Sequence, residues 1–160
     1  MAEDLRIIEG SREDQYSSLI PQIRALIAEE EDLIANMANS CAALKEQFNF
    51  FWVGFYLVKA EELVVGPFQG PVACSRISFG KGVCGLAWKT RQTIIVPNVY
   101  LFPGHIACNE LSKSEIVIPL IFENVLLGVL DIDSKDFDYF TLTDKKYLEE
   151  LASLIVARSY

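Results

Sequence analysis

Apolar residues recur every three or four positions across residues 13–45, and this spacing predicts helical structure there. The recurrence is interrupted at residues 29–32, where four acidic side chains form either a solvated face of one helix or a break between two helices. Pro21 fits the first turn of a helix and would disrupt a helix interior. Cys41 lies on the apolar stripe, so we interpret it as a core residue.

After these residues the pattern favours strands. Short runs of aromatic and β-branched residues between turn-forming residues are typical of strands. The last two runs are separated only by Glu123 and Asn124, which predicts a hairpin of two buried strands. The predicted strands cover residues 48–58, 63–66, 93–96, 116–122 and 125–132.

Two further helices are predicted in the second half of the chain. A short one covers residues 83–90, and a last one begins at Thr141, which forms a capping pattern with Asp144. The order helix, strands, irregular middle, hairpin, helix predicts an α+β fold. We expect an antiparallel sheet with the terminal helices packed on one face and the irregular residues 68–113 roofing a pocket on the other. The length predicts a single domain, residues 1–160.

Composition and charge narrow the function classes. Hydrophobic residues make up 51% of the chain, too many for a disordered protein. The formal charge of -8 argues against binding to nucleic acid or to an anionic membrane. The first residues do not form a secretory signal, and no uninterrupted apolar run approaches the roughly 18 residues of a membrane span. We therefore expect a cytoplasmic protein whose thiols are kept reduced.

Three of the four cysteines, Cys74, Cys84 and Cys108, lie beside glycine and proline residues that predict turns. A reactive thiol needs such access. Their separations are too long for the paired ligands of a typical zinc site, and no Cys-x-x-Cys pattern is present, so neither a metal nor another cofactor is predicted. The remaining interpretations are a nucleophilic thiolate with one or two resolving thiols, or three inert thiols.

Acidic residues lie at two predicted strand ends. Asp131 and Asp133 face the same side of a strand, where mutual repulsion would raise the pKa of one carboxyl group. The pair is either a proton donor or ammonium site, or a solvated strand end. Glu115 directly precedes a buried strand, so it is an acid if it points inward and an ordinary charged strand end otherwise.

Aromatic residues and the single histidine complete the candidates. Trp52 and Tyr56 share one face of the first predicted strand and serve either core packing or the wall of a ligand pocket. His105 lies three residues before Cys108. It either lowers the pKa of that thiol or supports the turn.

Five segments carry a further signal: GPFQG at 66–70 with Cys74, GKGVCG at 80–85, FPGHIAC at 102–108, SEIV at 114–117 and GVLDIDS at 128–134. Together they resemble the free methionine-(R)-sulfoxide reductases, which are GAF-domain enzymes. Many members have an acid directly after the third cysteine, where this chain has Asn109. The Asn-Lys, Phe and Asp-Glu motif of many cyclic-nucleotide-binding GAF domains is not present.

The resemblance implies a role for each candidate residue. It implies that Cys108 is the nucleophile, that Cys74 is the main resolving thiol, and that Cys84 is a second or alternative resolver. It also implies an acidic pocket and an aromatic wall. The residues of these two parts are Glu115, Asp131 and Asp133 for the pocket, and Trp52 and Tyr56 for the wall.

The implied activity is reduction of free methionine-(R)-sulfoxide to methionine through a sulfenic acid on Cys108 and an intramolecular disulfide, which thioredoxin resets. Preference for the R epimer follows from the resemblance alone. The rival class is a non-enzymatic GAF-type sensor that binds a small ligand or switches through a disulfide. The apolar stripe of the first helical region would serve a homodimer or a monomer core equally well.

Overall fold

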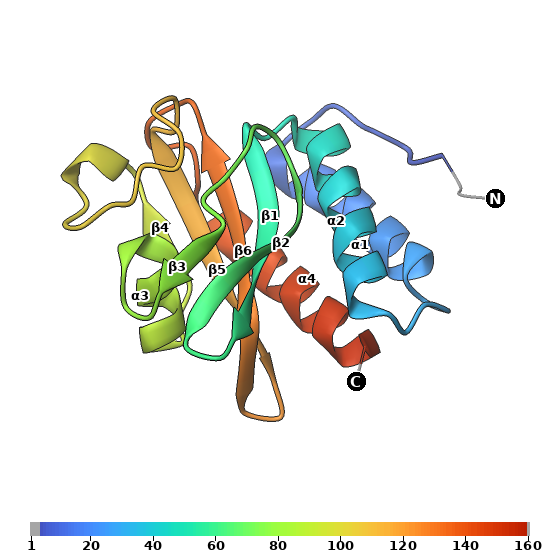
Figure 1. Ribbon diagram of the computed structural model, residues 1–160. Coiled ribbons are helices and arrows are strands. Elements are labelled where there is room, and N and C mark those ends of the chain that lie inside the picture. The colour runs from blue at the N-terminus through green and yellow to red at the C-terminus, as the bar shows by residue number, and fades with distance from the viewer. Residues whose placement is uncertain (1–3, 160) are drawn as a thin grey trace.

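A computed structural model describes residues 4–159 and contains one antiparallel sheet (Figure 1). Six strands pair in the order β3-β2-β1-β6-β5-β4. The two segments that pair at the centre, β1 and β6, come from opposite halves of the chain. The strands are β1 (Trp52–Lys59), β2 (Glu62–Gln69), β3 (Arg76–Ser78), β4 (Ile94–Val96), β5 (Ser114–Phe122) and β6 (Val125–Ser134).

The helices lie on both sides of this sheet. One side carries α1 (Arg12–Leu26), α2 (Leu33–Phe48) and α4 (Leu142–Ser159), with α1 packed on the other two (Figure 1). The short α3 (Gly82–Thr90) and the 3₁₀ turn η1 (Val99–Leu101) lie on the other side. This arrangement confirms the α+β prediction and the terminal helices on one face. Within residues 4–159, no helix has the length and apolarity needed to cross a membrane.

The first helical region contains two helices. The acidic run is a break, because Asp32 caps α2 by accepting a hydrogen bond from the Ala35 N–H. The expectation for Pro21 is wrong, because this residue lies inside α1. Pro21 is exposed, so water can bond the carbonyl oxygen that lacks an N–H partner in the helix.

The predicted first strand begins too early. Phe48 is the last residue of α2, and Asn49 ends the helix in the left-handed conformation with φ 50°. The aromatic residues at 48 and 50 pack into the helical layer, with ring centroids 5.0 Å apart. The strand itself starts at Trp52. Aromatic composition alone did not separate the end of the helix from the start of the strand.

Local sequence explains the hairpin and the last helix. Glu123 and Asn124 connect β5 to β6 with φ of 45° and 66°, as a tight two-residue hairpin requires. At the start of α4, the Thr141 N–H and hydroxyl both donate to Asp144 Oδ2, at 2.8 and 3.1 Å. Both predictions are confirmed, and the hairpin fixes which side chains of β5 and β6 face the same way.

The sheet separates two hydrophobic clusters. Alternating residues of the central strands, such as Val53 and Phe55, face the three long helices and form the larger cluster. Trp52 and Tyr56, which flank this pair along β1, face the opposite side, toward α3 and the loops. Cys41 is fully buried in the larger cluster, as predicted. The candidate residues of β1, β5 and β6 lie on the side opposite the long helices.

Candidate active site

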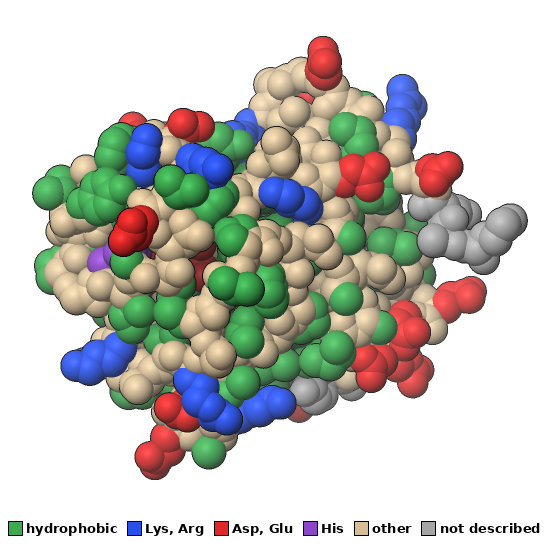
Figure 2. Space-filling model, turned by 45° about the horizontal axis from the view of Figure 1, so that its top comes forward, with side chains coloured by type: hydrophobic (Ala, Val, Ile, Leu, Met, Phe, Trp, Pro, Cys, Tyr) green, Lys and Arg blue, Asp and Glu red, His purple; other side chains and the backbone are tan. Residues whose placement is uncertain are grey.

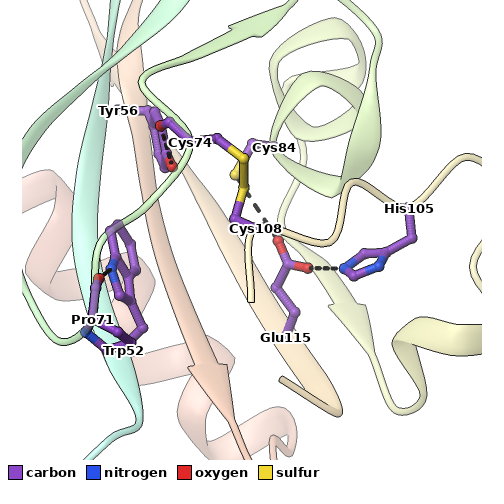
Figure 3. Close-up of a disulfide and its surroundings, with 8 residues drawn as sticks. All are labelled: Trp52, Tyr56, Pro71, Cys74, Cys84, His105, Cys108 and Glu115. Carbon is purple, nitrogen blue, oxygen red and sulfur yellow. Dashed lines mark hydrogen bonds and ion pairs between the residues drawn. A yellow bond between two sulfur atoms is a disulfide. The ribbon is translucent and has the colours of Figure 1, made fainter. Parts of the chain in front are cut away.

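A disulfide joins two loops that are distant in sequence. Cys74 follows β2, Cys108 precedes β5, and their Cα atoms are 5.4 Å apart (Figure 3). Cys108 is exposed and Cys74 is half-buried. The fold therefore brings two of the three predicted cysteines into one redox-capable pair that an external thiol can reach.

Cys84 lies behind this pair, on α3. It is only 3% exposed, and its Sγ donates a hydrogen bond to Glu115 Oε1 at 4.0 Å (Figure 3). Burial raises the pKa of the Cys84 thiol well above its usual value, and the nearby Asp131 raises it further. A thiol that keeps its proton is a weak nucleophile, so the geometry sets Cys84 apart from Cys74 and Cys108.

Three carboxylates lie on the pocket side of β5 and β6. Glu115 is paired with Asp133 across the two strands, and Asp131, two residues earlier on β6, lies on the same face. Burial raises the pKa of Glu115 and of Asp131 well above their usual values, and the nearby Asp133 adds to both shifts. Burial raises the pKa of Asp133 to about 6, although a hydrogen bond from the Ser112 hydroxyl opposes this shift. The inward orientation makes all three groups available as acids or as partners for a cation.

His105 contacts one of these carboxylates. Its Nε2 lies 3.6 Å from Glu115 Oε2 (Figure 3). Cys84 contacts the other carboxylate oxygen, Oε1. Burial lowers the pKa of His105, which favours the neutral ring. The turn thus places His105 against the acid, a partner that the sequence spacing did not suggest.

Aromatic side chains form the wall beside the disulfide. The rings of Trp52 and Tyr56 have centroids 5.9 Å apart, and Gly54 lies between them on the strand. A Cβ atom at Gly54 would lie 2.4 Å from the Trp52 ring, so glycine is needed there. Trp52 Nε1 donates to the Pro71 carbonyl at 3.1 Å, and the Tyr56 hydroxyl donates to the Cys74 carbonyl at 3.0 Å. The wall therefore also fixes the loop that carries Cys74.

These groups surround one cavity of about 40 Å³. Its lining includes Val72 and Ile106, which are 86% and 37% exposed and mark the mouth. Figure 2 shows the histidine, in purple, partly exposed at the surface beside an acidic side chain. Three lining residues were not among the candidates: Ser112 and Val72 lie outside the motifs, and Ile106 lies within the segment FPGHIAC but carries no reactive group. The candidate residues that line the cavity are Trp52, Tyr56, Cys84, His105, Cys108, Glu115, Asp131 and Asp133, whereas Cys74 is not part of the lining.

Comparison with known proteins places this site in context. The GAF domain model matches residues 28–157. The GAF domain-containing protein A of Dictyostelium discoideum is 59% identical, over 97% of this chain and 99% of the relative. A free methionine-R-sulfoxide reductase of Escherichia coli is 45% identical, over 86% of this chain and 84% of the relative. The X-ray structure of the free methionine-R-sulfoxide reductase from Neisseria meningitidis in complex with its substrate has a TM-score of 0.96 at 48% identity, over 98% of this chain and 95% of that chain.

Proposed function

The chain belongs to the free methionine-R-sulfoxide reductase family of GAF-domain proteins, and from that premise we propose that it reduces free methionine-(R)-sulfoxide to methionine. The observation that carries the proposal is the disulfide between Cys74 and Cys108 at the mouth of a cavity lined by buried carboxylates. A sensor needs the cavity or the disulfide, whereas a reductase needs both together.

The reaction uses the two thiols of the reduced protein. The Cys108 thiolate attacks the sulfur of the sulfoxide, and the sulfoxide oxygen takes up a proton. Oxygen transfer releases methionine and leaves a sulfenic acid on Cys108. The Cys74 thiol then attacks the sulfenic sulfur, an S–S bond forms and water leaves. Two thiols are oxidised by two electrons while the sulfoxide is reduced to a thioether.

Glu115 is our choice for the acid that protonates the sulfoxide oxygen. It is 6% exposed, and burial raises its pKa well above its usual value, which favours the protonated form that an acid catalyst needs. It lies in the same cavity as Cys108, the proposed nucleophile. Contacts with Cys84 and His105 hold the two carboxyl oxygens in place.

The remaining cavity groups would recognise a free amino acid. Asp131 and Asp133 pair with the substrate ammonium group, because a desolvated cation needs an anionic partner. The methyl end of the substrate rests on Trp52 and Tyr56. Backbone N–H groups of the turn before Cys108 bind the substrate carboxylate. A methionine sulfoxide within a peptide lacks both charged groups and would be excluded.

Cys74 is our choice for the resolving thiol, because it is bonded to Cys108 while Cys84 lies buried beside Glu115. Thioredoxin, a protein dithiol, would reduce the exposed disulfide by exchange. Such a cycle suits the cytoplasm, where dithiol donors are kept reduced. Cys84 then serves as a second resolver at most.

The test is reductant consumption with free methionine-(R)-sulfoxide, thioredoxin and its recycling system. We expect sustained turnover in the wild type, none with Cys108→Ser, and none when an oxidised peptide replaces the free amino acid. Absence of wild-type turnover under fully reducing conditions would favour the ligand- or redox-sensor function. Equal rates with the peptide would overturn the recognition of the free amino acid.

A further inference from the structure

Cys84 has no required step in the proposed reaction, yet it lies at a distinctive position. Its Sγ and one carboxylate oxygen each of Glu115 and Asp131 all lie within 4.8 Å of one another. The three residues come from α3, β5 and β6, so only the folded chain brings them together. All three are buried and line the cavity.

Glu115 contacts His105, whose neutral ring is favoured by burial, so within residues 4–159 the cluster has no permanently charged cation beside it. Among the described residues that line the cavity, none is a lysine or an arginine. Asp131 is 7% exposed, and its Oδ1 has no hydrogen-bond partner among the described residues. A buried carboxylate oxygen without a partner is costly, and a cation that reached it would remove that cost.

We propose that Cys84, Glu115 and Asp131 form a binding site for one thiophilic divalent cation of the Zn²⁺ class. Sulfur together with carboxylate oxygen suits Zn²⁺, whereas Mg²⁺ and Ca²⁺ prefer oxygen alone. The three protein ligands leave a fourth position to water from the cavity.

The distances permit this geometry after a small closure. With a Zn–S distance of about 2.3 Å and a Zn–O distance of about 2.1 Å, tetrahedral ligand atoms lie roughly 3.5 Å apart. Cys84 Sγ lies 4.0 Å from Glu115 Oε1, and the full set lies within 4.8 Å. Side-chain rotations that move the ligand atoms by about 1 Å therefore complete the site. The thiol proton of Cys84 leaves to solvent when the metal–sulfur bond forms.

Access to the site is through the mouth of the cavity, beside the exposed Val72. The Cys74–Cys108 disulfide removes both of its sulfur atoms from competition for the metal. Cys84 and Cys41 are then the free thiols of the described chain. In the oxidised protein, Cys84 is therefore the only free thiol beside the proposed ligands among the described residues. Cys41 is a matched control, because it is equally buried but has no carboxylate partner of this kind.

The test is titration of the oxidised full-length protein with Co²⁺, a spectroscopic substitute for Zn²⁺, in the absence of reductant. We expect a thiolate-to-cobalt charge-transfer band that saturates at one equivalent and disappears when Zn²⁺ is added. The band should persist in Cys41→Ala and vanish in Cys84→Ser. In Asp131→Asn the affinity should fall at least about tenfold.

Absence of the band in the wild type, or its persistence in Cys84→Ser, would overturn the site. Unchanged affinity in Asp131→Asn would remove the carboxylate from the ligand set and overturn the proposal in its stated form. Thermal unfolding of each variant checks that the fold is intact. The titration involves no turnover, so its result is separate from reductase activity, which is measured with thioredoxin and its recycling system in metal-free buffer.

Discussion

The two faces of the sheet are built from the same strands but differ in the side chains that they bury. On the helix side, Phe55 and Ile116 are fully buried among apolar side chains, and their burial stabilises the fold. On the cavity side, their neighbours Tyr56 and Glu115 are almost as buried but carry polar groups. Adjacent residues therefore contribute to different parts of the molecule, one to the apolar core and the other to the lining of the cavity.

The comparison shows that the cavity face is built at a cost in stability. Burying Glu115, Asp131 and Asp133 without a lysine or arginine beside them opposes folding, since each charged form loses its water. The helix face provides the stability that this arrangement requires. Substitutions on the cavity face should therefore change mainly turnover, and substitutions on the helix face should change mainly the free energy of unfolding.

The largest contrast is expected between two cysteines. Cys108→Ser removes the proposed nucleophile and should lower turnover at least about 10³-fold, with little effect on unfolding under reducing conditions. Cys41→Ala, on the helix face, leaves a small cavity and should cost about 1–2 kcal/mol of unfolding free energy while turnover stays near that of the wild type. Steady-state kinetics and denaturant unfolding test both variants. Loss of turnover in Cys41→Ala alone would reverse the assignment.

The next contrast compares two consecutive residues of β5. Glu115→Gln keeps the shape but cannot donate an acidic proton, so kcat should fall about 10²–10⁴-fold with the fold retained. Ile116→Val should leave kcat unchanged and cost about 0.5–1.5 kcal/mol of stability. Single-turnover formation of methionine, measured beside thermal unfolding, separates the two effects. A kcat for Glu115→Gln within a factor of two of the wild type would eliminate Glu115 as the acid.

A smaller effect concerns stability and pH. Burial raises the pKa of Asp133 to about 6, above the ordinary value of 3.8, so the folded protein holds this proton more tightly than the unfolded chain. Stability from this group is then present below pH 4 and is lost as the pH rises to about 6. Asp133→Asn removes this loss, and the rise of the pKa from 3.8 to about 6 corresponds to a gain of about 3 kcal/mol at pH 8 but little at pH 4. Urea unfolding at both values measures it, and a gain that is independent of pH would contradict this cause.

The spacing of apolar residues predicted much of the fold. Side chains of a strand alternate between the two faces of the sheet, and the buried side chains of a helix recur every three or four residues. This spacing gave the hairpin around Glu123, the last helix at Thr141 and the shared face of Trp52 and Tyr56. The end of α2 was missed, because Phe48 and the aromatic residues after it suit a helix end and a strand equally well.

The site was predictable in its members but not in its contacts. Turn residues and strand ends pointed to each cysteine and acid. The hydrogen bond from Cys84 to Glu115 joins residues 31 positions apart and depends on how α3 packs over the sheet. The contact between His105 and Glu115 likewise depends on the path of a loop that no pattern specifies.

The smallest contrast tests the aromatic wall with one chemical change on each face. Tyr56→Phe removes the hydrogen bond to the Cys74 carbonyl, which holds the loop of the proposed resolving thiol. A lost bond of about 0.5–1.5 kcal/mol should slow disulfide formation roughly 2–10-fold, while methionine release in the first turnover stays closer to the wild type. Tyr16→Phe removes a hydroxyl bonded to Asp144 on the helix face, and should lower stability without changing the disulfide step. Rapid quenching with separate assays of methionine and free thiols resolves the two steps. If both variants slowed disulfide formation equally, the two faces would be coupled, and the division between stability and chemistry would not hold at this wall.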